Sequence, residues 1–229
     1  MKTLTKGQRK LDKSKKRGYL SAGFNLSPAD ESVPHGGRNM CPKAGACKAL
    51  CLRYAGMNQM TTHEKARVQR TLMWLDHPDA FTSMATSEID ALLRKAERDA
   101  LTPTLRPNLL SDDPKLARRF ARLYPDVQVY DYTKIHLTFS LDVSAENERD
   151  ALDALDHGIN VAVPMDVAAD APMPESWTLN GRTLPMIDGD ADDLRFLDPV
   201  GIFVGLRGKK ITGGRQKGVD AGFYRSPDA

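Results

Sequence analysis

Three cysteines lie within eleven residues of one another in a chain that has no others. Cys41, Cys47 and Cys51 follow the spacing Cys-x5-Cys-x3-Cys. An odd number of cysteines packed this closely is a poor framework for disulfides, whereas thiolates on one short loop are common ligands of zinc and of iron–sulfur clusters. We therefore predict that residues 41–51 form a metal-binding loop.

Two metal centres are consistent with this loop. Three thiolates can bind three irons of a [4Fe–4S] cluster and leave the fourth iron open for an outside ligand such as S-adenosylmethionine (SAM). Zinc would instead take the three thiolates and a fourth protein ligand, for which His35 or His63 would serve. Three buried free cysteines without a metal are the remaining interpretation.

A second set of candidate residues follows the predicted strands. In parallel α/β folds, ligand-binding residues collect at the carboxyl ends of the strands. The residues expected to form a polar, small-molecule-binding rim there are Asn108, Ser111, Asp131, Lys134, Ser140, Asp188 and Arg207. Within this polar rim, we expect Asp131 and Lys134 to face one another and to grip a zwitterionic group such as the methionine part of SAM. Their neighbours Asp112, Ser144 and Asp190 could simply be helix N-caps.

Several common catalytic motifs are missing from the sequence. It contains no Gly-x-Gly-x-x-Gly, no P-loop, no Gly-x-Ser-x-Gly and no His-Glu-x-x-His. The acidic run that starts at Asp188 lacks the glycine and glutamate that a calcium-binding EF-hand loop requires. Nucleotide hydrolysis by a P-loop and hydrolysis by a catalytic triad are therefore disfavoured.

The elements that would position these residues alternate between strands and helices after Pro103. Helices are predicted over residues 61–75, from Pro78 to about 96, and over 114–124, 146–157 and 190–196. Strands are predicted over residues 19–26, 104–110, 127–130, 136–141, 159–164, 183–187 and 201–206. This alternation predicts an α/β fold, either a partial (β/α) barrel or an open, mostly parallel sheet of six to seven strands covered by helices. The strands that end at Tyr130 and begin at His136 are too close for a parallel crossover, so we expect an antiparallel pair or a shorter strand.

The basic residues are concentrated at the two ends of the chain. The net charge is only +3, yet residues 1–17 carry eight lysines and arginines against one acidic residue, and residues 207–229 carry six against two. We therefore predict a disordered basic tail over residues 1–18, a single α/β domain over 19–206 and a basic tail over 207–229. Such tails could make weak contacts with nucleic acid. No stretch approaches about 18 apolar residues and no secretory signal is evident, so we expect a cytoplasmic protein without membrane contact.

The cysteine block, Cys-Pro-x-Ala-x-x-Cys-Lys-x-x-Cys-Leu-x-x-Ala-Gly, resembles a family of tailed-bacteriophage and prophage proteins. Residues 127–134 and 187–199 share this resemblance, which covers roughly residues 19–207. The family is distantly similar to phage radical-SAM-like proteins, which are partial (β/α) barrels with a three-cysteine cluster loop. The resemblance implies an iron–sulfur, radical-SAM-like protein that acts on an unknown substrate in the host cytoplasm. The alternative is a zinc-stabilised, non-catalytic phage accessory protein that contacts nucleic acid or host proteins.

Overall fold

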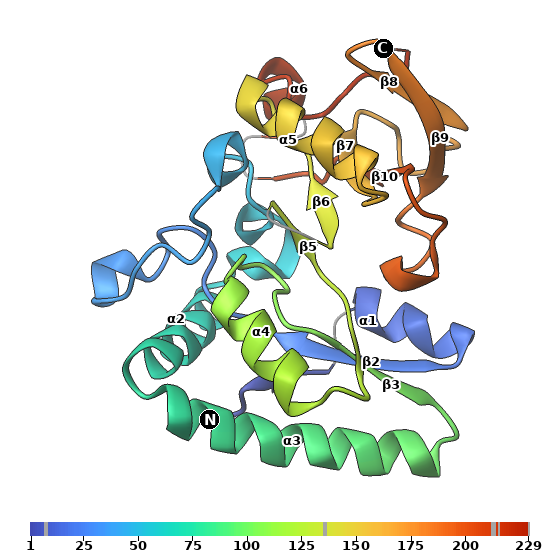
Figure 1. The fold of residues 1–229 in the computed structure, drawn as a ribbon. Coiled ribbons are helices and arrows are strands. Elements are labelled where there is room, and N and C mark those ends of the chain that lie inside the picture. The colour runs from blue at the N-terminus through green and yellow to red at the C-terminus, as the bar shows by residue number, and fades with distance from the viewer. Residues whose placement is uncertain (7–8, 135–136, 212–213, 215, 229) are drawn as a thin grey trace. The chain divides into compact units, whose positions relative to one another are not determined.

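The computed structural model of the chain describes residues 1–6, 9–134, 137–211, 214 and 216–228 (Figure 1). The chain divides into two compact units, each of which draws on separated stretches of the sequence. Unit 1 comprises Met1–Pro42, Gln59–Asp131 and Asp192–Leu194, and unit 2 comprises Lys43–Asn58, Tyr132–Ala191 and Arg195–Ala229. Each unit has its own sheet and its own hydrophobic core.

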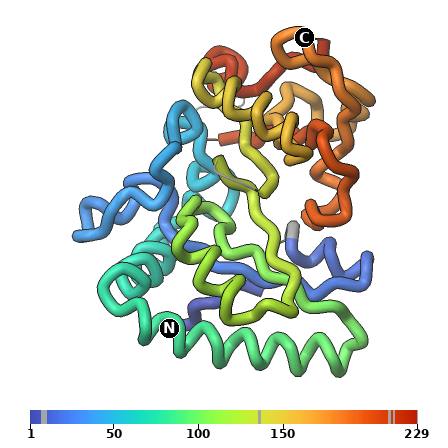
Figure 2. Tube along the Cα trace, in the orientation of Figure 1, coloured from blue at the N-terminus to red at the C-terminus, as the bar shows by residue number. Residues whose placement is uncertain are grey.

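Unit 1 is built on a four-stranded sheet with the order β1-β2-β3-β4. The strands are Leu4–Thr5, Tyr19–Phe24, Thr102–Arg106 and Gln128–Val129. β2, β3 and β4 are parallel, whereas β1 is antiparallel to β2. The helices α2 (Thr61–Asp76), α3 (Pro78–Arg98) and α4 (Pro114–Leu123) flank this sheet. Figure 2 traces α3 as one uninterrupted helix, and it packs against β1, β2 and β3.

Four aromatic side chains join the helices of unit 1 to its sheet. The ring of Phe24 on β2 lies 5.6 Å from that of Phe81 on α3 and 4.5 Å from that of Phe120 on α4, measured between ring centroids. Trp74 on α2 meets Phe81 edge-on at 5.5 Å. Because aromatic side chains bury large apolar areas, this cluster is a main source of stability for unit 1.

The described part of the basic N-terminal segment packs on unit 1 through two leucines. Leu4 in β1 pairs with Phe24, and the carboxylate of Glu88 accepts the backbone N–H groups of Thr3 and Leu4 at 3.0 and 2.8 Å. Leu11 in α1 (Arg9–Lys13) is only 1% exposed. This arrangement differs from the disordered tail expected over residues 1–18, because two apolar residues anchor a segment whose composition is otherwise basic.

Unit 2 is built on a six-stranded sheet with the order β5-β6-β7-β10-β9-β8. The strands are, in that order, Tyr132–Thr133, Thr138–Ser140, Val161–Met165, Phe203–Arg207, Arg182–Asp188 and Ser176–Leu179. All neighbouring pairs are parallel except β8 and β9. The helices of this unit are α5 (Ala145–Asp156), which Ser144 caps through its side chain, and α6 (Gln216–Asp220).

The predicted C-terminal tail also contributes contacts to unit 2. Arg225 donates its backbone N–H to Pro164 and accepts the N–H of Asp166, both at 2.8 Å, so it lies along the end of β7. Tyr224 beside it is buried.

The two mostly parallel sheets flanked by helices confirm the α/β fold class, and neither sheet forms a closed barrel within the described residues. Where the sequence predicted one sheet of six to seven strands, the structure has two. β4 belongs to one sheet and β6 to the other, and β4 is shorter than the predicted strand 127–130, which was one of the two expected alternatives. His136, predicted to begin a strand, lies outside the described residues. None of the helices in the described ranges is long and apolar enough to cross a membrane.

Candidate functional site

A polar network lies at the carboxyl ends of β3 and β4 in unit 1. The backbone N–H and the side-chain amide of Asn108 both donate to Oδ2 of Asp131 at 2.9 Å. The side-chain oxygen of Asn108 accepts the hydroxyl of Ser111 at 2.8 Å. All three residues are buried. Three residues of the predicted polar rim are therefore brought together, and they satisfy one another's hydrogen-bonding groups.

The same network fixes the start of α4. Asn108 accepts the backbone N–H of Asp113 at 3.0 Å. The carboxylate of Asp113 caps the helix by accepting the N–H of Lys115 at 2.9 Å, and it also accepts the indole N–H of Trp74 at 2.7 Å. The N-cap is therefore Asp113 and not Asp112. These contacts orient α4 and the side chains that it carries.

Arg106, the last residue of β3, connects two buried carboxylates. Its Nη1 lies 2.7 Å from Asp193, which is fully buried, and its Nε lies 3.7 Å from Asp131. Burial raises the pKa of the nearby Tyr130 hydroxyl, and the Asp193 carboxylate raises this pKa further. Neither Arg106 nor Asp193 was predicted from the sequence, because the first lies within a predicted strand and the second within an acidic loop.

In unit 2, Lys134 anchors the segment that carries two of the cysteines. Its ammonium group forms a buried ion pair with Asp142 and donates to the backbone oxygen of Ala44 at 3.1 Å. Gly45 has a positive φ of 49°, and a Cβ atom at this position would lie 2.6 Å from Oδ2 of Asp142. Only glycine therefore permits this close approach, which places the start of residues 43–58 beside the end of β6.

Asp131 and Lys134, which were expected to face one another, each bind a residue of their own unit. Asp131 belongs to unit 1, where it binds Asn108, whereas Lys134 belongs to unit 2, where it binds Asp142. Sequence proximity suggested one pair because it could not show that the chain passes from one sheet to the other between these residues.

The remaining rim residues lie in unit 2 and are engaged in structural contacts. One guanidinium nitrogen of Arg207 contacts both carboxylate oxygens of Asp188 at 2.8 Å, and another donates to the backbone oxygen of Ala171 at 2.8 Å. Ser140 ends β6, and its backbone oxygen accepts the side-chain amide of Asn147 at 3.2 Å. Arg207 is therefore already saturated with acceptors that a substrate carboxylate or phosphate would have to displace.

The three cysteines are reduced thiols divided between the units. Cys41 in unit 1 is buried, and its sulfur accepts the N–H of Ala29 at 3.2 Å. Cys47 and Cys51 belong to unit 2, where the sulfur of Cys51 caps a short 3-10 helix, Leu52–Tyr54. Among the described residues, no group of three or more His, Cys, Asp or Glu side chains could hold a metal ion. The metal centre, like SAM binding, therefore stays a prediction from the sequence.

Metal analysis of single-cysteine variants tests that prediction directly. If Cys41, Cys47 and Cys51 share one ion or cluster, each Cys→Ala change is expected to abolish the metal content of protein purified without oxygen, because removal of one thiolate opens the site. Elemental analysis together with the visible absorbance spectrum would distinguish iron from zinc. Retention of the full metal content in any two of the variants would contradict a shared site.

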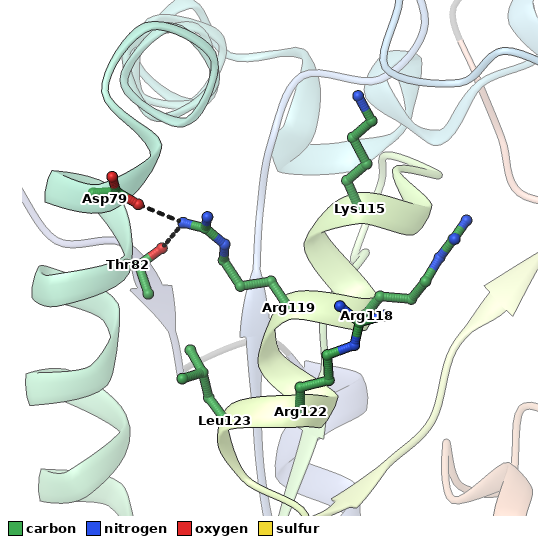
Figure 3. A pocket seen from close by; sticks show the side chains of 7 residues that line it. All are labelled: Asp79, Thr82, Lys115, Arg118, Arg119, Arg122 and Leu123. Atoms are coloured by element: carbon green, nitrogen blue, oxygen red, sulfur yellow. Dashed lines mark hydrogen bonds and ion pairs between the residues drawn. The ribbon is translucent and has the colours of Figure 1, made fainter.

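A basic groove lies between α3 and α4 in unit 1 (Figure 3). It has a volume of about 560 Å³ and is lined by Asp79, Thr82, Lys115, Arg118, Arg119, Arg122 and Leu123. α4 carries four basic residues and no acidic one. Its apolar residues Leu116 and Phe120 are buried against the sheet, so the basic residues are left on the outer side of the helix.

The basic side chains of α4 fall into two groups. Lys115, Arg118 and Arg122 are exposed, and none has a side-chain hydrogen bond or ion pair with another described residue. Arg119 instead reaches toward α3, where it contacts Asp79 and Thr82 (Figure 3). The apolar positions of this helix predicted it correctly from the sequence. The basic face was not predicted as a binding surface, although four of the ten residues of α4 are basic.

The fold and the groove together define an α/β protein with a cationic surface on one helix. The chain belongs to the Gene product 88 family, whose model matches residues 2–226. The match supports the expected assignment to a phage protein family. No curated protein and no solved structure matched the chain.

Proposed function

We propose that this protein is a phage accessory protein that binds nucleic acid through the basic groove between α3 and α4. The observation that carries the proposal is the exposed row of Lys115, Arg118 and Arg122, which has no acidic partner among the described residues. Uncompensated cations on one helix face create a local positive potential even though the net charge of the chain is only +3.

The spacing of these cations suits a row of phosphates. At about 1.5 Å per residue, Lys115 and Arg122 lie about 10 Å apart along the axis of α4. One DNA strand rises about 3.4 Å per nucleotide, so the row spans about three nucleotides. Arginine in particular matches phosphate geometry with its planar set of donors.

The groove favours contacts with the phosphate backbone over reading of the bases. None of its seven lining residues is aromatic, so it offers no platform on which bases could stack. Phosphate contacts supply affinity without sequence information. We therefore expect binding that depends strongly on salt and weakly on sequence.

Fluorescence anisotropy with a short labelled DNA duplex and the matching single strand, over a range of salt concentrations, tests this function. A triple variant, Lys115→Ala with Arg118→Ala and Arg122→Ala, is expected to bind at least about tenfold more weakly at low salt. The slope of log affinity against log salt is expected to become shallower by about 3, because three phosphate contacts are lost.

A matched control removes the same charges from another exposed helix face. Arg94, Lys95 and Arg98 lie near the end of α3, are exposed and are outside the groove. Their triple replacement by Ala is expected to leave the salt slope within about 1 of the wild-type value, since one lysine and two arginines are again lost but no groove contact is. The proposal fails if the two triple variants bind equally, or if the wild-type protein binds neither form of DNA.

A further inference from the structure

The position of Arg119 differs from that of the other cations in the groove. Its Nη1 lies 2.8 Å from the hydroxyl oxygen of Thr82, 3.1 Å from Oδ1 of Asp79 and 3.2 Å from the backbone oxygen of Pro78. Its guanidinium carbon also lies 5.5 Å from the centroid of the Trp74 ring. The side chain is therefore held by three oxygens at one nitrogen and lies near an aromatic ring, whereas the side chains of Lys115, Arg118 and Arg122 do not reach toward α3 (Figure 3).

All the hydrogen bonds of Arg119 with described residues involve the same nitrogen. Nε and Nη2 form the second edge of the guanidinium plane, and their hydrogens make no hydrogen bond to the described residues. Two parallel N–H groups on one edge are the arrangement that binds a phosphate in bidentate fashion. The side chain is only about one-third exposed, at 36%, so the groove restricts the directions from which a phosphate can approach it.

We infer that Arg119 is the orienting phosphate ligand of the groove: Thr82 and Asp79 hold one edge of its guanidinium so that the other edge grips one phosphate of a nucleic acid in bidentate fashion. This inference rests on the proposed function and adds a division of labour to it. Lys115, Arg118 and Arg122 attract the backbone from flexible side chains, whereas Arg119 fixes its register. A fixed donor pair loses less conformational freedom on binding than a mobile one, so it contributes more affinity for the same charge.

Replacement of Arg119 by lysine tests this inference, because lysine keeps the positive charge but lacks the planar pair of N–H donors of the guanidinium. An Arg119→Lys variant is expected to bind the labelled DNA duplex about tenfold more weakly than wild type, since it loses a charge-assisted hydrogen bond. Arg94→Lys, on the exposed face of α3 and outside the groove, is the matched control and is expected to bind as the wild type does, since it makes the same exchange away from the groove. Thermal midpoints of both variants establish that each is folded.

A second variant separates the positioning of Arg119 from direct contact with the phosphate. Thr82→Val keeps the shape and the charge of the groove but removes one of the three oxygens that hold Nη1. It is expected to weaken DNA binding about threefold without changing the salt slope, because no phosphate contact is removed.

The outcomes distinguish this inference from the proposed function. Absence of DNA binding by the wild-type protein would overturn both. If the wild type binds and the triple variant of Lys115, Arg118 and Arg122 loses affinity, but Arg119→Lys and Thr82→Val both bind as wild type does, the proposed function stands and the orienting role of Arg119 is wrong.

Discussion

Replacement of Arg67 by Met is expected to lower the free energy of unfolding by about 3–5 kcal/mol, because it would leave a buried carboxylate without its cation. Arg67 on α2 is 1% exposed, and it binds both carboxylate oxygens of the buried Glu31, with Nε–Oε2 at 2.8 Å and Nη2–Oε1 at 2.5 Å. Without the guanidinium of Arg67, the buried negative charge of Glu31 would lose the cation of this ion pair. Urea unfolding followed by circular dichroism measures the loss.

Two further variants isolate the cause of this loss. Arg94→Met on the exposed face of α3 changes the same residue types and is expected to alter stability by at most about 0.5 kcal/mol. A double variant, Arg67→Met with Glu31→Gln, removes both charges and is expected to regain part of the stability, since no buried charge is left behind. Equal stability of Arg67→Met and Arg94→Met would show that the buried pair contributes nothing.

The helices of unit 1 were the most predictable part of the fold. The sequence predicted helices over residues 61–75 and 114–124, and the structure has them at Thr61–Asp76 and Pro114–Leu123. Their limits are set locally: α4 begins with Pro114 at its first turn, and α2 ends just before Pro78, which begins α3. Such signals require no knowledge of distant parts of the chain.

The division into two sheets could not be predicted in the same way. β4 and β5 have two residues each, Gln128–Val129 and Tyr132–Thr133, which is too short for any alternation of apolar and polar residues to appear. Which sheet a strand joins depends on partners far away in the sequence. Residues 127–141 were therefore predicted as two strands of one sheet, although the chain leaves one sheet and enters the other there.

The candidate site shows the same limit on the prediction of function. The rule that polar residues gather at strand ends correctly brought Asn108 and Asp131 together, because β3 and β4 are neighbours. Lys134 also follows a strand, β5, but its partner Asp142 lies beyond the end of β6 in the second sheet, which the sequence did not reveal. It also could not reveal the groove, since Lys115 and Arg118 lie on a helix and not at a strand end.

Replacement of Lys134 by Met is expected to destabilise unit 2 by about 3–5 kcal/mol, because Asp142, which is 2% exposed, would lose the cation of its buried ion pair. The substitution also removes the hydrogen bond from Nζ to the backbone oxygen of Ala44. Residues 43–58 should therefore open more often. Limited digestion with trypsin is expected to cleave after Lys48 or Arg53 faster than in the wild-type protein, and thermal unfolding measures the loss of stability.

The control for this prediction lies on the same segment. Lys43 also forms an ion pair, with Asp150 at 3.1 Å, but both side chains are exposed, at 51% and 39%. Lys43→Met is expected to change stability by at most about 1 kcal/mol and to leave the rate of cleavage nearly unchanged, because water already screens this pair. Adding Asp142→Asn to Lys134→Met should restore part of the stability, since the amide retains an oxygen for the N–H of Ser144 and carries no buried charge. If Lys134→Met and Lys43→Met have the same stability and the same cleavage rate, Lys134 does not anchor the cysteine-bearing segment.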